Sequence, residues 1–292
     1  MRPEDCREAL ATLGPPWNPQ EITALEGGWS YWTFRADDHI VRFPRTANDA
    51  LLLEREFALL PIIRDRIGVP APRYTVRGEW RGRPFGAYPH LPGRLVSAAD
   101  LAVPAAKLPA ALGNALRALH ETPLAALTHV DTSPDGWWQR KRAFLDECRA
   151  RAFPLLPAHV QAVAAREIEH AEQRFRDGAV QPALAHNDLG LVHVLTDGHK
   201  LTGIIDWSDA EVTDPVIDFV GIVGAGGSQA VAAVLGGYGM PPGEAFWERL
   251  WFLAWVAPLH DILYGLDTGD DDVLHAGIAG VETRMRSSGR LL

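Results

Sequence analysis

Asp188, His193 and Asp206 have the types and spacing of residues that could perform phosphoryl transfer. Asp188 lies in a loop-forming stretch, His193 follows five positions later, and a turn at 197–198 leads into a β-branched run that ends at Asp206. The transition state of phosphoryl transfer requires positioning and charge neutralisation rather than covalent chemistry. An acid that orients a hydroxyl, with a neutral ligand and a carboxylate for Mg²⁺, meets that need.

The order of these residues separates the segment from a chance match. A single H-x-D or I-I-D-W sequence occurs by chance, and its acid or histidine is usually a cap or a surface group. Here the loop acid, the ligand, the hairpin and the second acid follow one another, and Asp214-Pro215 and Asp218-Phe219 come next. We therefore interpret the segment as one functional motif.

The segment from His186 to Phe219 resembles the catalytic and metal-binding core of the aminoglycoside phosphotransferase family, small-molecule kinases with a fold similar to that of protein kinases. The family motif runs H-x-D, four residues, N or H, then I-D-W/F and D-P-x-x-D. The sequence is most similar to the 2''-phosphotransferase branch, through H-N-D at 186–188, His193 at the second metal position and L-T-G-I-I-D at 201–206. Macrolide 2'-phosphotransferases are also similar, because they share that histidine.

The resemblance implies an α+β, bilobal, protein-kinase-like fold. Residues 1–88 would form a small β-rich nucleotide-binding lobe, residues 89–95 a hinge, and residues 96–292 a larger helical lobe with the catalytic loop and the acceptor pocket. The implied activity is transfer of the γ-phosphate of ATP or GTP, with Mg²⁺, to a hydroxyl of an aminoglycoside-type antibiotic. Such a protein would be a resistance phosphotransferase.

The resemblance also implies a role for each motif residue. Asp188 would accept the proton of the acceptor hydroxyl or orient it, and His193 and Asp206 would hold Mg²⁺ at the phosphates. His186 would brace the loop. The acids after the metal strand would be structural, because an acid there can cap a helix or tie down the loop: Asp209, Asp214 and Asp218. Asp209 could instead touch metal or water.

The N-terminal region predicts three strands around a glycine turn. The runs 22–25, 31–35 and 39–43 are rich in β-branched and aromatic residues, which is typical of a meander. Gly27, Gly28 and Ser30 in the first turn could present backbone N–H groups to phosphates, although such a sequence can also be only a turn. By resemblance, Arg42 would contact the α and β phosphates in place of the usual lysine, with a planar fork instead of a point charge.

A predicted helix at 49–67 carries the expected partner of Arg42. Glu54 and Glu56 both lie on it, and we favour Glu56. Strand candidates at 74–76 and 84–88 follow, and the stretch 89–93 has the proline and glycine content of a linker. By resemblance this stretch is the hinge, so Tyr88 and His90 would lie at the purine, which backbone groups would recognise.

Helical patterns continue through the C-terminal region, at 108–120, twice within 137–177, and at 228–235, 243–265 and 271–288. Trp251 belongs to an aromatic stripe that is core first and a wall of the acceptor pocket second. By resemblance, Asp261 would bind an ammonium group of the acceptor. The acids at 267–272 are more typical of a solvated surface.

Composition restricts the class of partner. The 292 residues include 47% hydrophobic ones and carry a formal net charge of -9, and no basic stripe is present to offset the repulsion of nucleic acid. The N-terminus lacks the apolar core of a signal peptide, and no uninterrupted apolar run is expected to span a membrane. Cys6 and Cys148 are expected to be free thiols. We expect a cytoplasmic monomer that binds a nucleoside triphosphate and a small hydroxyl acceptor, without nucleic acid or membrane.

Two other classes stay open. A pseudokinase would bind nucleotide without transfer; the presence of Asp188 and Asp206 together argues against it, whereas Arg42 and His193 leave it open. A metabolite kinase for choline, homoserine or a sugar would share every residue on the nucleotide side. Only the acceptor pocket would separate it from an antibiotic kinase.

Overall fold

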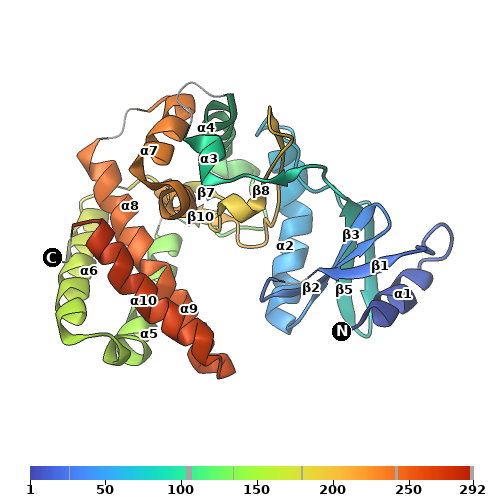
Figure 1. Ribbon diagram of the computed structural model, residues 1–292, viewed down its shortest axis with the longest axis horizontal. Helices are drawn as coiled ribbons and strands as arrows, with labels where there is room; N and C mark the ends of the chain where they lie inside the picture. The colour runs from blue at the N-terminus through green and yellow to red at the C-terminus, as the bar shows by residue number, and fades with distance from the viewer. Residues whose placement is uncertain (26, 103–106, 134, 179, 241–242, 290–292) are drawn as a thin grey trace.

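The chain folds into a β-rich N-terminal region and a mostly helical C-terminal region that lie side by side (Figure 1). The computed structural model describes residues 1–25, 27–102, 107–133, 135–178, 180–240 and 243–289. The turn that was predicted at 26–30 is described from residue 27 onward. The α+β class expected from the sequence is confirmed.

One antiparallel sheet forms the N-terminal region, in the order β1-β2-β3-β5-β4. Its strands are β1 (Ile22–Leu25), β2 (Tyr31–Ala36), β3 (His39–Pro44), β4 (Val76–Trp80) and β5 (Arg83–Pro89). The predicted meander of the first three strands is confirmed. The strand predicted at 74–76 was wrong, because β4 only begins at Val76. A central glycine, Gly78, and charged outward residues hid its alternating pattern.

Two helices pack against this sheet or beside it. The first, α1 (Pro3–Ala11), places Cys6 and Leu10 in a small core with Phe34, Phe43 and Phe85. The second, α2 (Ala47–Arg64), starts two residues before its predicted position of 49, at a capping box in which Thr46 and its N3 acid exchange hydrogen bonds.

The end of α2 belongs to a different core. Its residues Leu59, Leu60 and Ile63 join the large hydrophobic cluster of the C-terminal region, which also contains Cys148. One helix therefore connects the two regions by packing, and each region holds one of the two cysteines. Both thiols are free and buried, as the sequence predicted.

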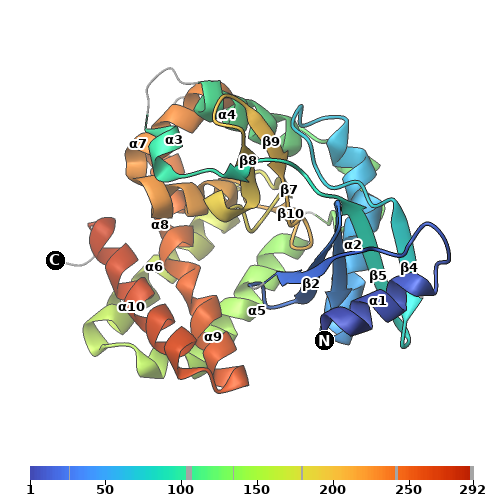
Figure 2. The ribbon, with the colours of Figure 1, turned by 45° about the vertical axis from the view of Figure 1, so that its right-hand side comes forward.

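Two small sheets hold the motif segment in the C-terminal region (Figure 2). In one, β6 (Arg94–Leu95), β8 (Val194–Thr196) and β9 (Leu201–Ile204) pair antiparallel. In the other, β7 (Ala183–Ala185) pairs with β10 (Glu211–Thr213). The strands on either side of the catalytic loop are thus fixed by pairing.

Helices make up the rest of the C-terminal region. They are α3 (Ala98–Leu101), α4 (Lys107–His120), α5 (Gly136–Arg151), α6 (Ala158–Arg176), α7 (Val220–Tyr238), α8 (Glu244–Val256), α9 (Pro258–Thr268) and α10 (Asp271–Ser287). The single helix predicted at 243–265 was wrong: Pro258 at the first position of α9 divides it in two. The helix predicted at 228–235 begins directly after a kink of α7 at Gly227 (φ 66°, ψ -171°), but the helix continues to Tyr238.

The longer helix, α7, is glycine-rich and depends on tertiary packing. A Cβ at Gly237 would overlap the carbonyl of Ala110 on α4, so the two helices approach each other more closely than larger residues allow. The segment Pro215–Tyr238 has a hydropathy of 1.6 and is long and apolar enough to cross a membrane by length and composition alone, although Asp218 interrupts the apolar run. Here it lies between α4 and α8 as a core helix (Figure 1).

Candidate active site

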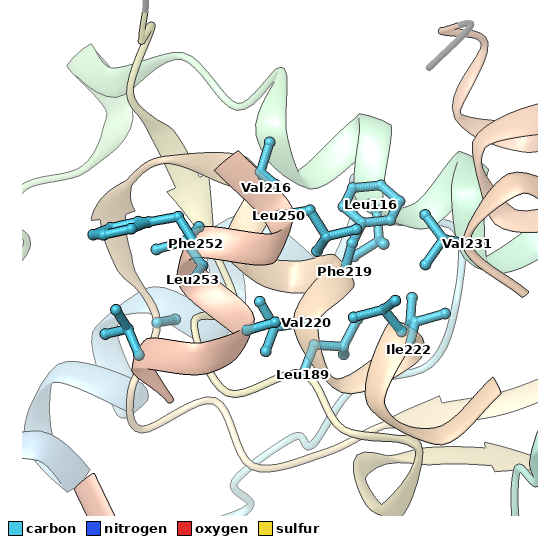
Figure 3. Close-up of a cluster of buried hydrophobic side chains, with 14 of the residues drawn as sticks. Leu116, Leu189, Val216, Phe219, Val220, Ile222, Val231, Leu250, Phe252 and Leu253 are labelled. Carbon is cyan, nitrogen blue, oxygen red and sulfur yellow. The ribbon is translucent and has the colours of Figure 1, made fainter. Parts of the chain in front are cut away.

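The loop that carries Asp188 is fixed from below by a buried carboxylate. Asp218 is fully buried and accepts hydrogen bonds from the backbone N–H groups of His186 (2.9 Å) and Asn187 (2.8 Å). Asn187 has a left-handed φ of 68°, which asparagine tolerates better than most residues. The side chain of Leu189 points into the hydrophobic cluster of Figure 3. Asp188 is therefore held between two anchored neighbours.

A histidine that the sequence analysis missed completes this support. His120, at the end of α4, donates from Nε2 to Asp218 (3.0 Å) and accepts at Nδ1 from the hydroxyl of Tyr238 (2.8 Å). These partners are 98 and 118 positions away, so no local spacing could have identified them. Asp218 has the structural role expected for it.

Asp214 is structural as well. It caps the 3₁₀ helix η4 (Pro215–Phe219) by accepting from the N–H of Val216, 3.1 Å away, and it pairs with Arg249 of α8 at 2.9 Å. It thereby fixes the start of the chain segment that leads into α7.

Asp188 presents its carboxylate at the surface of the site, with 59% of the side chain exposed. Partial desolvation raises its pKa to about 6; His193 opposes this shift, and the carboxylates of Asp209 and Asp206 add to it. A carboxylate with a raised pKa is a better proton acceptor than an ordinary one near neutral pH.

His193 lies between the two acids. Its Nδ1 is 3.7 Å from Asp188 Oδ2, and its Nε2 is 3.7 Å from Asp206 Oδ2. Nδ1 also donates to the backbone carbonyl of Asp188 (2.8 Å), which places the ring hydrogen on Nδ1. The lone pair of Nε2 therefore faces Asp206, as a metal ligand requires.

Asp206 has a backbone conformation that only its surroundings can maintain. Its φ is 64°, in the left-handed region, which costs on the order of 1–3 kcal/mol for a residue other than glycine. The preceding residues are tied down: His186 Nε2 donates to the carbonyl of Ile205 (3.0 Å), and Trp207 Nε1 to that of Ile204 (2.8 Å). His186 thus braces the loop, as expected, and burial lowers its pKa.

Arg42 connects the sheet, α2 and the acid of the motif. One terminal nitrogen, Nη1, donates to both oxygens of Glu56 (3.0 and 2.8 Å), and Nη2 donates to Asp206 Oδ1 (2.7 Å). The guanidinium also lies over the ring of Tyr31, at 3.9 Å. A lysine could not reach both carboxylates in this way, because it offers one point charge.

Burial and charge act against each other in this group. Burial raises the pKa of Glu56 to about 7 despite the attraction of Arg42. For Asp206, burial also opposes ionisation, but Arg42 and His193 hold its pKa below the ordinary value. Glu56 is fully buried whereas Glu54 is exposed, so the structure places Glu56 and not Glu54 at Arg42.

The remaining predicted nucleotide residues lie in the turn between β1 and β2, on β5 and just after β5. Gly27 and Gly28 have φ values of 102° and 80°, which favour glycine. The carbonyl of Ser30 accepts from the N–H of Arg45 (2.9 Å). Tyr88 is buried on β5, where its side chain contacts Tyr74 rather than solvent.

One backbone group of His90, its N–H, is engaged within the sheet region. Its backbone N–H donates to the carbonyl of Asp38 (2.7 Å), so this amide is already engaged. A contact between His90 and a purine would have to come from its carbonyl. The sequence could not show this, since the partner belongs to the turn between β2 and β3.

The predicted acceptor residues lie on α8 and α9, outside the cluster around His193. Trp251 is half-buried against the helical core. Asp261 is half-buried; burial raises its pKa, and Arg284 opposes that shift. One turn further along α9, Tyr264 stacks on Trp29 of the glycine turn, with ring centroids 4.0 Å apart. This contact between the two regions was not predicted.

The site offers two ligands suited to a divalent cation. Nε2 of His193 and Oδ2 of Asp206 face each other, and the donor set fits Mg²⁺ bound mainly through substrate phosphates. Over the ranges that the structure describes, no group of three His, Cys, Asp or Glu side chains is arranged to hold a metal ion. A cation here would therefore depend on a bound nucleotide for its other ligands.

Comparison with known proteins identifies the family and the fold. The pattern of the phosphotransferase enzyme family, APH, matches residues 21–250. Viomycin phosphotransferase from Streptomyces vinaceus is 29% identical over 154 residues, which are 51% of this chain and 50% of that protein. The chain thus matches about half the length of this relative.

Solved structures share the fold over nearly the whole chain. The GDP and kanamycin complex of APH(2")-IIia has a TM-score of 0.86 at 23% identity and covers 96% of this chain and 97% of that one. Macrolide 2'-phosphotransferase type I has a TM-score of 0.72 at 21% identity, with 95% and 96% covered. With the family pattern matched from residue 21 to residue 250, this chain belongs to the phosphotransferase enzyme family and has its kinase-like fold.

Proposed function

We propose that the protein transfers the γ-phosphate of a nucleoside triphosphate to a hydroxyl of an aminoglycoside-type acceptor. The observation that carries this proposal is the arrangement of Asp188 and Asp206 on either side of His193, each 3.7 Å from its ring. One acid is exposed, where an acceptor hydroxyl can reach it, and the other is paired with a buried arginine. Phosphoryl transfer needs both kinds of acid, one that orients the nucleophile and one that holds a metal ion at the phosphates.

Each residue has a role that its contacts support. Asp188 orients the acceptor hydroxyl and accepts its proton, while His193 and Asp206 hold Mg²⁺, which would neutralise charge on the phosphates when bound. Glu56 keeps Arg42 in place. Contact between Arg42 and the α and β phosphates, which the resemblance implies, would use the second N–H of Nη2, because the first donates to Asp206 and Nη1 donates to Glu56.

In this proposal the nucleoside triphosphate binds between the two regions. Residues 1–88 form the nucleotide-binding lobe, residues 89–95 the hinge and residues 96–292 the lobe that binds the acceptor. Gly27, Gly28 and Ser30 would cover the phosphates, and Tyr88 and the carbonyl of His90 would border the purine. GDP is bound in the solved relative named above, so GTP is tested beside ATP.

A cationic acceptor is favoured by charge. The formal net charge is -9, Asp261 is half-buried on α9, and the solved relative holds kanamycin. A macrolide is the alternative that the shared fold of macrolide 2'-phosphotransferase supports. Viomycin joins the panel because the relative from Streptomyces vinaceus is named for it.

The test is phosphate transfer from ATP and from GTP to aminoglycosides, macrolides, viomycin and amino alcohols. We expect transfer to an aminoglycoside, with an acceptor KM that rises with ionic strength, because exposed charge pairs are screened over roughly 8–10 Å at physiological salt. Transfer to macrolides alone, or to amino alcohols alone, would replace the aminoglycoside proposal.

Asp261→Asn tests the acceptor side of the site. The acceptor KM should rise about fivefold, the effect of losing one partly exposed ion pair of about 1 kcal/mol, while the nucleotide KM stays unchanged. Asp272→Asn is the matched control, because this exposed acid on α10 is removed with the same loss of charge. An equal rise in both variants would indicate a general effect of net charge.

A further inference from the structure

Helix α2 contacts the Asp206 loop through a second residue, one position before Glu56. Arg55 donates from Nη2 to the backbone carbonyl of Ser208, 2.7 Å away and 153 positions later in the chain. Ser208 is buried, and its hydroxyl donates to Asp206 Oδ1 (3.3 Å). A fixed carbonyl at Ser208 therefore restricts both the backbone after Asp206 and one contact of its carboxylate.

We propose that Arg55 is a positioning residue, which fixes the backbone of residues 206–208 so that the free oxygen of Asp206 faces His193. The inference rests on the proposed metal role of Asp206. It assigns to Arg55 no contact with nucleotide or acceptor.

Two neighbouring residues of one helix hold the same acid by different routes. Glu56 acts on the Asp206 side chain through Arg42, and Arg55 acts on the following backbone through Ser208. Because Glu56 and Arg55 both belong to α2, a shift of this helix would move both sets of contacts together. The position of α2 and the orientation of the acid are thus linked.

The loop needs such a hold on its C-terminal side. Asp206 has a left-handed φ of 64°, which persists only where neighbouring contacts determine it. The bonds of His186 and Trp207 fix residues 204 and 205, before the acid. After the acid, Arg55 fixes the carbonyl of Ser208 at 2.7 Å, and the longer bond of Asn187 Nδ2 to the carbonyl of Asp209 (3.3 Å) follows one residue later.

Arg55 can be replaced without opening the core. It lines a cavity of about 450 Å³ on the outer side of α2, together with Glu54 and Arg77. Arg77 is a matched control: it lines the same cavity and donates to α2 at the carbonyl of Phe57 (3.0 Å). The guanidinium of Arg77 also lies over the ring of Phe57, 4.6 Å from its centroid, so this arginine contacts α2 itself.

The first experiment is hydrogen exchange of residues 204–210 in the nucleotide-free protein. In Arg55→Met these amides should exchange about fivefold faster than in the wild type, the factor that corresponds to the loss of one hydrogen bond. Arg77→Met should leave them unchanged, and Arg55→Lys should give an intermediate rate. Equal exchange in Arg55→Met and Arg77→Met would overturn the inference.

The second experiment is nucleotide binding as a function of Mg²⁺ concentration. Arg55→Met should need about tenfold more Mg²⁺ for half-maximal binding, as residues that support metal ligands do when replaced. Its nucleotide affinity in EDTA should equal that of the wild type. An unchanged Mg²⁺ requirement would count against the inference. A wild-type protein that binds no nucleotide would overturn the proposed function instead, and the exchange experiment would still decide the role of Arg55.

Discussion

At the scale of single residues, a substitution of Asp188 should slow phosphate transfer and leave nucleotide binding unchanged. Asp188→Asn should lower the rate of transfer by about 10² to 10⁴, because it removes the proton acceptor and leaves the phosphate side intact. Nucleotide affinity, measured by calorimetry, should stay within twofold of the wild type, roughly the experimental error of such a comparison. Asp38→Asn is the control, since that acid is 86% exposed in a turn of the sheet. A mutant with near-native turnover would remove Asp188 from the mechanism.

The two proposed metal ligands should respond differently to substitution. Asp206→Ala should lose Mg²⁺-dependent nucleotide binding, because it removes the carboxylate that faces Nε2 of His193. His193→Asn should remain active, since a carboxamide oxygen is a good Mg²⁺ ligand. Titration of nucleotide binding with Mg²⁺ measures both, and thermal unfolding checks that each variant folds. If His193→Asn behaved like Asp206→Ala, position 193 would have a role other than metal binding.

At the scale of elements, the contact between α4 and α7 sets a limit on side-chain size. Gly237→Ala should lower the free energy of unfolding by about 1–3 kcal/mol, because the added methyl group would overlap the carbonyl of Ala110. Urea denaturation measures this loss. Gly236→Ala is the neighbouring control, where a Cβ would meet nothing within 4 Å.

The control variant Gly236→Ala is also expected to change the free energy of unfolding, in the opposite direction. Alanine at 236 should stabilise the protein by up to about 1 kcal/mol, since glycine is the poorer helix former. A lower free energy of unfolding in both variants would mean that α7 requires glycine at both 236 and 237, whatever space surrounds them. The comparison would then say nothing about the packing of α4.

At the scale of the whole molecule, the motif could be predicted because it is local in sequence. Asp188, His193 and Asp206 lie on one loop and one hairpin, so their spacing alone brings them together. Residues that act across the fold could not be predicted. Arg55 and His120 reach partners 153 and 98 positions away, and nothing in the neighbouring sequence marks them.

Element boundaries failed where tertiary packing outweighed local preference. A kink at Gly227 precedes the predicted start of this helix, and the close contact of Gly237 with α4 stabilises the helix beyond its predicted end at 235, to Tyr238. The fold class was predicted from the resemblance of the segment 186–219 to a known family, which implied a β-rich and a helical region. The contact of Trp29 with Tyr264 joins these two regions, and neither local sequence indicates it.

The placement of one cysteine in each hydrophobic core makes the two regions separately observable. Burial raises the pKa of both Cys6 and Cys148 to about 12, so neither thiol should react with an aromatic disulfide at pH 8 until its core opens. In Cys6→Ala and Cys148→Ala variants, the single remaining thiol reports one region. We expect Cys6 to be labelled faster, because its core is smaller and should open at a lower free energy. Equal labelling rates would mean that the bridge formed by α2 makes the chain open as one cooperative unit.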